Sequence, residues 1–463
     1  MLAEIRGLNE ECGIFGIWGH KDAPQVTYYG LHSLQHRGQE GAGMVVKNEA
    51  GLTRQKGSGL LTEVFSRDTL EKLSGTAAIG HVRYSALGRG DIAEIQPLLF
   101  HFETSSLALC HNGNLVNSLR LRRELEAQGS IFQTNSDSEI LAHLIKRTPR
   151  GSLVESLAAA LTQIKGGFAF LLLTNKKMLA ARDPNGIRPL SIGKLGDAYV
   201  IASETCAFDV IGAQFVRDVE PGEIVVINED GLRSLRYAEA EELAICSMEF
   251  VYFSRPDSSI AGMNVHTARK NMGKILAKEA PVDADVVVPV PDSGISAAIG
   301  YAEATGIPYE IGLIKNRYVA RTFIQPSQEL REQGVKMKLS AVRGVVEGKR
   351  VVLIDDSIVR GTTSKRLVTL LRGAGAAEVH MRISCPPLKY PCFYGIDFKD
   401  PSELIAHQNS VEEIRRILGV DSLAFLSIEG LVDAVNLSVP GKYRGLCVAY
   451  FNGDYPTPLY DFA

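Results

Sequence analysis

The sequence predicts two domains of different fold class, an α+β domain in the first half of the chain and an α/β domain with a parallel sheet in the second half. A chain of 463 residues exceeds the length at which one hydrophobic core stops growing, so two cores are expected. Before residue 236, short apolar runs are punctuated by glycine, as strands of a sheet are. After residue 285, apolar strands alternate with glycine-containing loops and helices, the pattern of a parallel sheet with crossover helices.

In the first half, three apolar runs are predicted strands and two periodic segments are predicted helices. The strands are GGFAFLLL (166–173), AYVIAS (198–203) and EIVVIN (223–228). The helices lie around 119–129 and 136–147, and the second opens with a good N-cap and an acidic first turn. We assign residues 12–236 to this α+β domain.

The second half contains three units of strand and loop, DVVVPVPDSGISAAIGYA (285–302), KRVVLIDDSIVRGTTSKRLVTLLRGAG (349–375) and EVHMRISCPP (378–387). Parallel sheets bind ligands beyond the carboxyl ends of their strands. We assign 285–436 to the α/β domain, 237–284 to a connecting segment, and 437–463, rich in Gly, Pro and aromatic residues, to an irregular C-terminal tail.

The composition favours small-molecule partners and a cytoplasmic location. A net charge of -3 over mixed signs gives no large basic field, which argues against nucleic-acid and membrane-surface binding. No apolar run is long enough to cross a bilayer, and MLAEIRGLNEE lacks the apolar core of a secretory signal. In a long cytosolic chain the seven cysteines are expected to be reduced thiols, catalytic groups or metal ligands.

Cys12, in ECGIFGIWG, precedes a glycine and an apolar run, which fits either a nucleophile or a buried inert thiol. Other segments supply groups that match an amino-acid substrate. Arg83 offers a planar donor pair for a carboxylate, and Asp137 offers a carboxylate for an ammonium group. Asn112 and the backbone of Gly113 offer donors for an oxyanion. Taken singly, these pieces also fit a surface salt bridge, a helix cap and a turn, respectively.

The ordered combination of these residues with HSLQHRGQEGAGM (32–44) resembles the glutaminase domain of the N-terminal-nucleophile amidotransferases, over essentially residues 12–230. The resemblance implies the α+β sandwich of the N-terminal-nucleophile hydrolases. In that family Arg37 and its glycine-rich neighbours would form a loop that closes over the substrate. The implied site residues are Cys12, Asn112 and Gly113 for catalysis, and Arg37, Arg83 and Asp137 for glutamine binding.

The resemblance also implies a propeptide. In this family the nucleophile is the first residue of the mature protein, and its own α-amino group can serve as the general base. Here residues 1–11 precede Cys12. We therefore expect these residues to be removed autocatalytically after Glu11.

The most informative stretch of the second half is VVLIDDSIVRGTTSK (351–365). An apolar strand ends in Asp355 and Asp356, and a loop of glycine and hydroxyl residues leads to a helix. Loop amides and a helix N-terminus attract phosphate, while adjacent carboxylates hold ribose hydroxyls or position Mg²⁺. The simpler alternative is a capped turn from strand to helix.

This stretch is similar to the phosphoribosyl pyrophosphate (PRPP) signature of the type I phosphoribosyltransferases. Three companions fit the propeptide-bearing amidophosphoribosyltransferases in particular: 289–302, 315–339 and PCFYGID (391–397). The resemblance implies that Mg²⁺ binds at Ser293, Asp355 and Asp356, and the 5-phosphate at Ser357, Gly361, Thr362 and Thr363. The basic segment 315–339, with Arg321, fits either a solvated loop or a lid that stabilises departing pyrophosphate.

The same subgroup commonly holds a [4Fe-4S] cluster through four cysteines. Cys246, Cys392 and Cys447 occupy three of the expected places, but the fourth is Tyr450. Three thiolates could bind a cluster with Tyr450 or an outside ligand, or Cys385 could substitute. Equally, the cysteines could be buried with no cluster.

Taken together, the resemblance predicts an enzyme that releases ammonia from glutamine and transfers it to PRPP, giving 5-phosphoribosylamine for purine biosynthesis. A sugar-phosphate aminating synthase would share the first half but would not need the PRPP signature. A regulatory protein that retains only glutaminase activity would not need both aspartates. Family membership further implies inhibition by purine nucleotides and a homotetramer.

Overall fold

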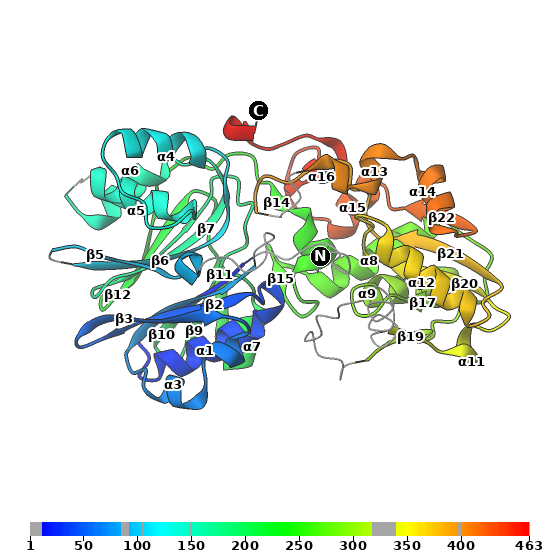
Figure 1. Ribbon diagram of the computed structural model, residues 1–463, viewed down its shortest axis with the longest axis horizontal. Helices are drawn as coiled ribbons and strands as arrows, with labels where there is room; N and C mark the ends of the chain where they lie inside the picture. The colour runs from blue at the N-terminus through cyan, green and yellow to red at the C-terminus, as the bar shows by residue number, and fades with distance from the viewer. Residues whose placement is uncertain are drawn as a thin grey trace.

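A computed structural model describes residues 12–84, 92–103, 105–148, 151–316, 339–395 and 400–462. Its first half is a sandwich of two antiparallel sheets with helices on both outer faces (Figure 1). The first sheet runs in the order β11 (Gln214–Asp218), β9 (Ser191–Leu195), β10 (Ala198–Ala202), β1 (Gly13–Trp18), β4 (Ala77–Arg83), β2 (Gly41–Asn48) and β3 (Gly51–Ser58). The second runs β13 (Gly231–Arg236), β12 (Glu223–Asn228), β8 (Met178–Arg182), β7 (Gly166–Leu173), β6 (Ser106–Leu115) and β5 (Leu98–His101).

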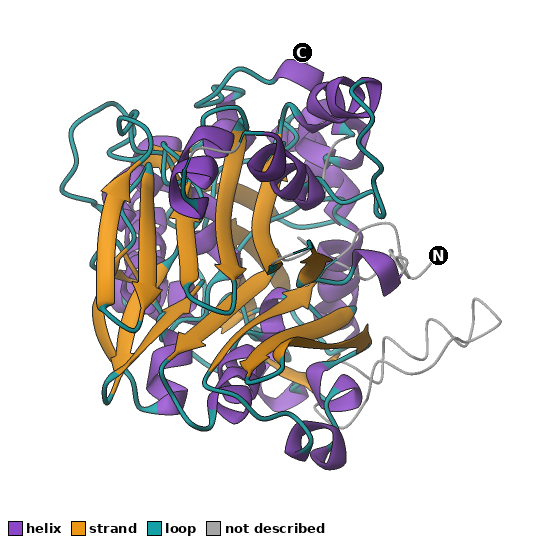
Figure 2. Ribbon diagram, turned by 90° about the vertical axis from the view of Figure 1, so that its left-hand side faces the viewer, coloured by secondary structure: helices purple, strands orange, loops and turns teal. Residues whose placement is uncertain are grey.

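Strand β1 shows why both faces of the first sheet are apolar. Side chains alternate along a strand, so Ile14 and Trp18 enter the core between the sheets, while Phe15 and Ile17 enter the core beneath the outer helices. All six residues of β1 are buried. Figure 2 shows the strands of this half from the side of the molecule that lies on the left in Figure 1.

The outer helices close the remaining two faces. Beside the first sheet lie α1 (Ala23–Ser33), α2 (Leu61–Val64), α3 (Arg67–Glu71) and α7 (Cys206–Ile211). Beside the second lie α4 (Ser118–Ala127), α5 (Ser138–Arg147) and α6 (Leu153–Leu161). The predicted α+β class is confirmed, and the predicted strands and helices of this half correspond to β7, β10, β12, α4 and α5.

The second half is built on a parallel sheet, as predicted. Its strand order is β17 (Val286–Pro289), β20 (Arg350–Asp355), β21 (Glu378–Ile383) and β22 (Ser422–Phe425), and each neighbouring pair is parallel. Around it lie α8 (Val265–Glu279), α9 (Ile295–Thr305), α11 (Arg343–Val346), α12 (Thr362–Gly373), α13 (Ile405–Gln408), α14 (Val411–Leu418) and α15 (Ile428–Val435). A separate antiparallel pair joins β18 (Leu313–Lys315) to β19 (Leu339–Ala341).

The C-terminal tail is more ordered than the predicted irregular segment. Its β23 (Leu446–Cys447) pairs in parallel with β14 (Ile245–Cys246), and α16 (Ala449–Asn452) follows. The residues of 446–451 are buried in the core of the second half, because their apolar and aromatic side chains fill the space beside the connecting segment. That segment also contains a π-helix, Glu249–Phe253, and the short pair β15 (Ser259–Ile260) and β16 (Met263–Asn264). None of the described helices is long and apolar enough to span a membrane.

The tail returns to the first half and caps one of its helices. Asp461 accepts hydrogen bonds from the backbone N–H groups of Leu119 and Arg120, at 2.7 and 3.2 Å, in the first turn of α4. The N-cap residue Asn117 makes no side-chain cap bond of its own. A carboxylate at this end also complements the helix dipole. The C-terminus therefore stabilises a helix more than 300 positions away in the sequence.

We predict that Asp461→Ala lowers the free energy of unfolding by about 1 kcal/mol, the usual cost of losing an N-cap. Denaturant unfolding measures the effect. The matched control is Asp454→Ala, which removes an exposed carboxylate from the same tail and should change stability by less than about 0.5 kcal/mol. Equal effects of the two substitutions would contradict the capping role.

Candidate active sites and a buried cysteine group

Cys12 lies just before β1, at the mouth of the space between the two sheets. Its thiol contacts the carbonyl oxygen of Tyr84, at 3.9 Å, immediately beyond the end of β4. It opens into a cavity of about 150 Å³. The lining residues are Cys12, Arg83, Tyr84, Glu94, Gln96, His111, Gly113, Asn135, Ser136 and Asp137. Four of the predicted glutaminase residues thus meet around one hollow: Cys12 before β1, Arg83 of β4, Gly113 of β6 and Asp137 at the start of α5.

Asn112 and Gly113 lie at the carboxyl end of β6. Gly113 has φ +130°, and a Cβ there would lie 2.1 Å from the carbonyl oxygen of Gly167, so the position requires glycine. The Asn112 side chain is fully buried, and neither of its amide atoms finds a hydrogen-bond partner among the described residues. Unsatisfied buried polar groups are uncommon and call for a ligand or a function. This amide therefore has a free donor, as an oxyanion-binding group needs.

Asp137 precedes α5 but does not cap it. Its side chain makes no cap bond; instead it accepts a hydrogen bond from the N–H of Leu115 at 2.9 Å and lies 3.6 Å from His111 Nδ1. Burial alone would raise the pKa of Asp137, but His111 and the hydrogen bonds hold it below its usual value. The carboxylate is therefore charged and aimed at the cavity, which favours the ligand-binding interpretation over the helix cap.

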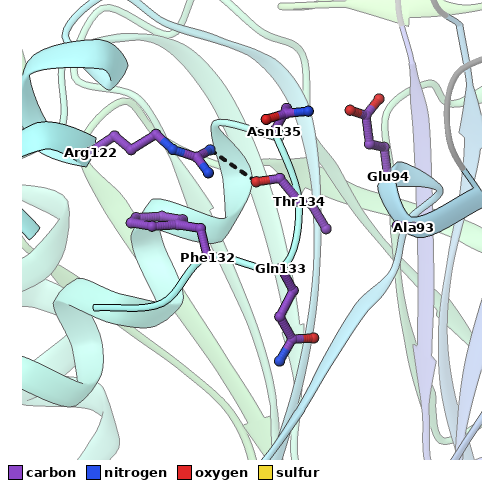
Figure 3. Close-up of a pocket in the computed structure, with 7 residues that line it drawn as sticks. All are labelled: Ala93, Glu94, Arg122, Phe132, Gln133, Thr134 and Asn135. Carbon is purple, nitrogen blue, oxygen red and sulfur yellow. Dashed lines mark hydrogen bonds between the residues drawn. The ribbon is translucent and has the colours of Figure 1, made fainter. Parts of the chain in front are cut away.

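Arg83 is engaged by a carboxylate of the protein. Its Nη2 lies 2.6 Å from Glu94 Oε2, and both side chains are mostly buried at the cavity wall. A smaller hollow lies next to the first and shares Glu94 and Asn135 with it (Figure 3). In that hollow the Arg122 guanidinium donates to the carbonyl of Thr134 at 2.9 Å, which holds the loop that leads to Asp137.

The thiol of Cys12 needs a base. Burial raises the pKa of Cys12, although Arg83 and Arg37 oppose the shift. The nearby imidazole of His81 is fully buried, and burial and Arg83 lower its pKa to about 3. The imidazole of His81 is therefore neutral. Among the described residues, the thiol of Cys12 donates a hydrogen bond only to the carbonyl oxygen of Tyr84.

Arg37 does not line the cavity, contrary to the expectation that it belongs to a loop over the substrate. The side chain is fully buried, because two buried carboxylates bind its guanidinium. Its Nη1 lies 2.5 Å from Glu204 Oε1, and its Nη2 lies 2.6 Å from Glu249 Oε1. Its Nε donates to the carbonyl of Cys12 at 3.3 Å. Arg37 therefore holds the backbone of the nucleophile from behind.

In the second half, Asp355 and Asp356 stand at the carboxyl end of β20. Both are 6% exposed, and Ser357 donates to Asp356 Oδ2 at 2.6 Å. Burial and the charge of Asp356 raise the pKa of Asp355 well above its usual value. Two adjacent buried carboxylates of this kind call for a cation.

The turn 291–294 and the start of α12 flank these aspartates. A Cβ on Gly294 would lie 2.4 Å from the carbonyl of Ile354, so the turn that carries Ser293 packs directly against the end of β20. Gly361, with φ +75°, precedes α12, and no side chain of the described residues caps that helix. Thr362 and Thr363 form its first turn, whose free amides suit a phosphate.

Two predictions fall outside the described residues: the propeptide, 1–11, and Arg321 with most of its basic segment. Lys315, at the edge of that segment, pairs with Asp292 Oδ2 at 3.0 Å.

The structure groups Cys246, Cys392 and Cys447 with Tyr450 in the core beside the tail. Cys246 and Cys447 are register partners in the pair β14 and β23. Burial raises the pKa of Cys246 and of Cys447 to about 12, and that of Tyr450 well above its usual value. Cys385 is also buried, and burial together with the charges of Asp356 and Asp355 raises the pKa of its thiol well above its usual value. The described residues contain no group of three or more His, Cys, Asp or Glu side chains placed to hold a metal ion.

Comparison with protein families matches each half separately. Residues 81–210 match the glutamine amidotransferase domain, and residues 264–391 match the phosphoribosyltransferase domain. The chain is therefore a phosphoribosyltransferase that carries a glutamine amidotransferase domain, which agrees with the two sites.

Full-length relatives make the assignment narrower. The chain is 64% identical to the amidophosphoribosyltransferase of Bacillus subtilis, over 99% of this chain and 97% of the relative. It is 55% identical to that of Staphylococcus aureus strain MRSA252, over 98% and 93%. A solved B. subtilis glutamine PRPP amidotransferase, in complex with ADP and GMP, superposes with a TM-score of 0.93 at 62% identity, covering 97% of this chain and 98% of the other. The chain belongs to the amidophosphoribosyltransferase family.

Sequence reasoning missed the groups that surround the predicted residues. His111, which stacks on Phe170 with ring centroids 4.2 Å apart, was not predicted as part of the site, although it belongs to the same CHNGN motif as Asn112. Glu249 is a lone charge within the apolar run ICSMEFVYF, which was a signal for a paired buried carboxylate. Glu204 and Arg188 carried no comparable signal.

Proposed function

We propose that the site around Cys12 releases ammonia from glutamine and that the site around Asp355 transfers this ammonia to PRPP. As a member of its family, the chain converts PRPP, glutamine and water to 5-phosphoribosylamine, glutamate and pyrophosphate, the first step of purine biosynthesis. The observation that carries the residue-level proposal is the convergence of Cys12, Arg83, Gly113 and Asp137 around one cavity.

In the glutaminase half, Cys12 attacks the carboxamide carbon of glutamine. Arg83 binds the substrate carboxylate and Asp137 its ammonium group, while the Asn112 amide and the Gly113 backbone stabilise the oxyanion. Collapse of the tetrahedral adduct releases ammonia and leaves a thioester, which water hydrolyses to glutamate. Removal of residues 1–11 would supply the base, because it frees the α-amine of Cys12 next to its own thiol.

In the phosphoribosyltransferase half, ammonia attacks the anomeric carbon of PRPP and pyrophosphate leaves. The first turn of α12, with Ser357, Thr362 and Thr363, would hold the 5-phosphate. Asp355, Asp356 and Ser293 fit Mg²⁺, because neither buried carboxylate forms an ion pair with a side chain of the described residues and Mg²⁺ usually combines one or two carboxylates with substrate oxygens. When bound, Mg²⁺ would neutralise the developing charge on pyrophosphate.

We predict that glutamate and pyrophosphate are released in equal amounts when glutamine and PRPP are both supplied, measured on protein whose intact mass starts at Cys12. Cys12→Ala should abolish glutamate release but keep pyrophosphate release with ammonium chloride as the nitrogen source. Asp356→Asn should lower pyrophosphate release by at least about 100-fold with either nitrogen source, as expected for a group acting in the transition state. Pyrophosphate release lost in Cys12→Ala with ammonium would contradict two separable sites.

Glu94 stands where the substrate carboxylate would bind, so Glu94→Gln should lower KM for glutamine. An ion pair of this exposure contributes up to about 1 kcal/mol, so the expected decrease is about twofold to fivefold. Initial rates of glutamate release measure it. The control Glu71→Gln removes the exposed Arg67–Glu71 pair elsewhere and should leave KM unchanged. An increase in KM would instead mean that Glu94 itself binds the substrate.

The cysteine group does not fit a four-cysteine iron–sulfur cluster. Tyr450 occupies the fourth place, and a buried phenol with a raised pKa is a neutral oxygen group, unlike the thiolates that clusters use. The Cys392 sulfur instead accepts a hydrogen bond from the N–H of Tyr394 at 3.3 Å. We therefore propose that this group is a packed part of the core.

Iron and sulfide analysis of anaerobically purified protein should accordingly find neither in stoichiometric amount. Tyr450→Cys should restore a fourth thiol and bind iron and sulfide, with the broad visible absorption of a cluster. Tyr29→Cys, at an exposed position on α1, is the matched control and should bind none. A full complement of iron and sulfide in the wild-type protein would refute the proposal.

We also propose two properties of the family for this chain. A related structure holds ADP and GMP, which supports purine nucleotides as inhibitors here. A homotetramer follows from the same family membership.

A further inference from the structure

Four fully buried charged side chains meet where the two halves join. We call this group, Arg37, Arg188, Glu204 and Glu249, the junction ion cluster. Glu249 binds Arg37 at 2.6 Å and Arg188 at 3.4 Å, and Glu204 binds Arg37 at 2.5 Å. His36 Nε2 also lies 2.7 Å from Glu204 Oε1, so an imidazole adjoins the two guanidinium groups and two carboxylates. A buried charge is costly unless it is paired, so these side chains hold each other in place.

On one side the cluster reaches the nucleophile. Arg37 donates from Nε to the carbonyl of Cys12 at 3.3 Å. Its aliphatic stem also packs against the next residue, since a Cβ on Gly13 would lie 3.4 Å from Arg37 Cδ. The position of the Arg37 guanidinium therefore sets the position of the backbone that carries the thiol.

On the other side the cluster reaches the phosphoribosyltransferase half. Glu249 begins the π-helix Glu249–Phe253, and Ser254 donates to its carboxylate at 2.5 Å. Arg269 of α8 then holds both ends of the π-helix, donating to the carbonyl of Phe250 near its start and to that of Ser254 just after its end, at 2.7 and 2.8 Å.

Helix α8 is in turn fixed to α9. A Cβ on Gly273 of α8 would lie 1.9 Å from the carbonyl of Ala297, so the two backbones touch. His266 and Ser296 add a side-chain contact at 2.9 Å. Helix α9 follows directly from the turn 291–294 at the proposed PRPP site. An unbroken series of buried contacts therefore runs from the carbonyl of Cys12 to that turn.

We propose that Glu249 is a positioning residue for the nucleophile, and that through Arg37 it ties the orientation of Cys12 to the state of the phosphoribosyltransferase half. Glu249 lies behind the nucleophile and outside the glutamine cavity. Arg37 is held between buried Glu249 and buried Glu204, so a shift of the π-helix changes the balance of these two pairs and with it the position of Arg37 and the Cys12 carbonyl. This inference rests on the proposed function of the two sites.

The test is Glu249→Gln, which keeps the shape of the side chain and removes its charge. Glutamate release is measured over a range of glutamine concentrations with and without PRPP, and pyrophosphate release is measured with ammonium chloride. We expect PRPP to raise glutamate release in the wild-type enzyme. In the variant, kcat for glutamate release with PRPP should fall by about tenfold or more, and the ratio of rates with and without PRPP should approach one. Ammonium-dependent pyrophosphate release should stay within about twofold of wild type.

Two further variants separate positioning from damage to the fold. Ser254→Ala removes one hydrogen bond to Glu249 without leaving a charge unpaired, and it should lower the PRPP ratio in the same direction but less. Glu239→Gln removes an exposed charge from the same connecting segment and should leave both activities unchanged. An unchanged PRPP ratio in Glu249→Gln, or an equal loss of ammonium-dependent activity in both Glu249→Gln and Ser254→Ala, would overturn the proposal. Absence of ammonium-dependent pyrophosphate release in the wild-type enzyme would instead refute the proposed function.

Discussion

The structure depends on the pairing of Arg37 with Glu249 inside the protein. Both side chains are fully buried, and neither charge can leave the other without a large desolvation cost. Since Arg37 belongs to the glutaminase half and Glu249 to the connecting segment, the pair fixes one half against the other. It also explains why Arg37 is absent from the glutamine cavity, where a residue of a closing loop was expected.

The two reaction centres obey the same physical rule in different folds. In the sandwich, β1 begins and β4 and β6 end beside one cavity, so the thiol of Cys12, the guanidinium of Arg83 and the backbone of Gly113 converge there. In the α/β half, parallel strands end at one edge, and the first amides of α12 remain free to bind phosphate. Each site thus gathers polar groups that its architecture places at the ends of strands and helices.

The C-terminal tail ties these halves together a second time. Its strand β23 pairs with the connecting segment, and Asp461 caps α4 of the glutaminase half. In the same region Tyr450 is buried in one core with Cys246, Cys392 and Cys447. Backbone pairing, hydrogen bonds and apolar burial therefore join the tail to the rest of the molecule.

The sequence by itself determined the two fold classes, because strand and helix periodicity is local. Its ordered motifs also singled out Cys12, Arg83, Gly113 and Asp137, which the structure places around one cavity. It also indicated that Asp355 and Asp356 stand together at the end of a strand, since two acids after an apolar run form a local pattern. Only the tertiary structure decided what these residues contact. Asp137 accepts a hydrogen bond from Leu115 instead of capping its helix, and Glu94 binds Arg83. Arg37 binds Glu204 and Glu249, which lie more than 160 positions away in the sequence. Such partners depend on how separate elements pack, and no local pattern records that.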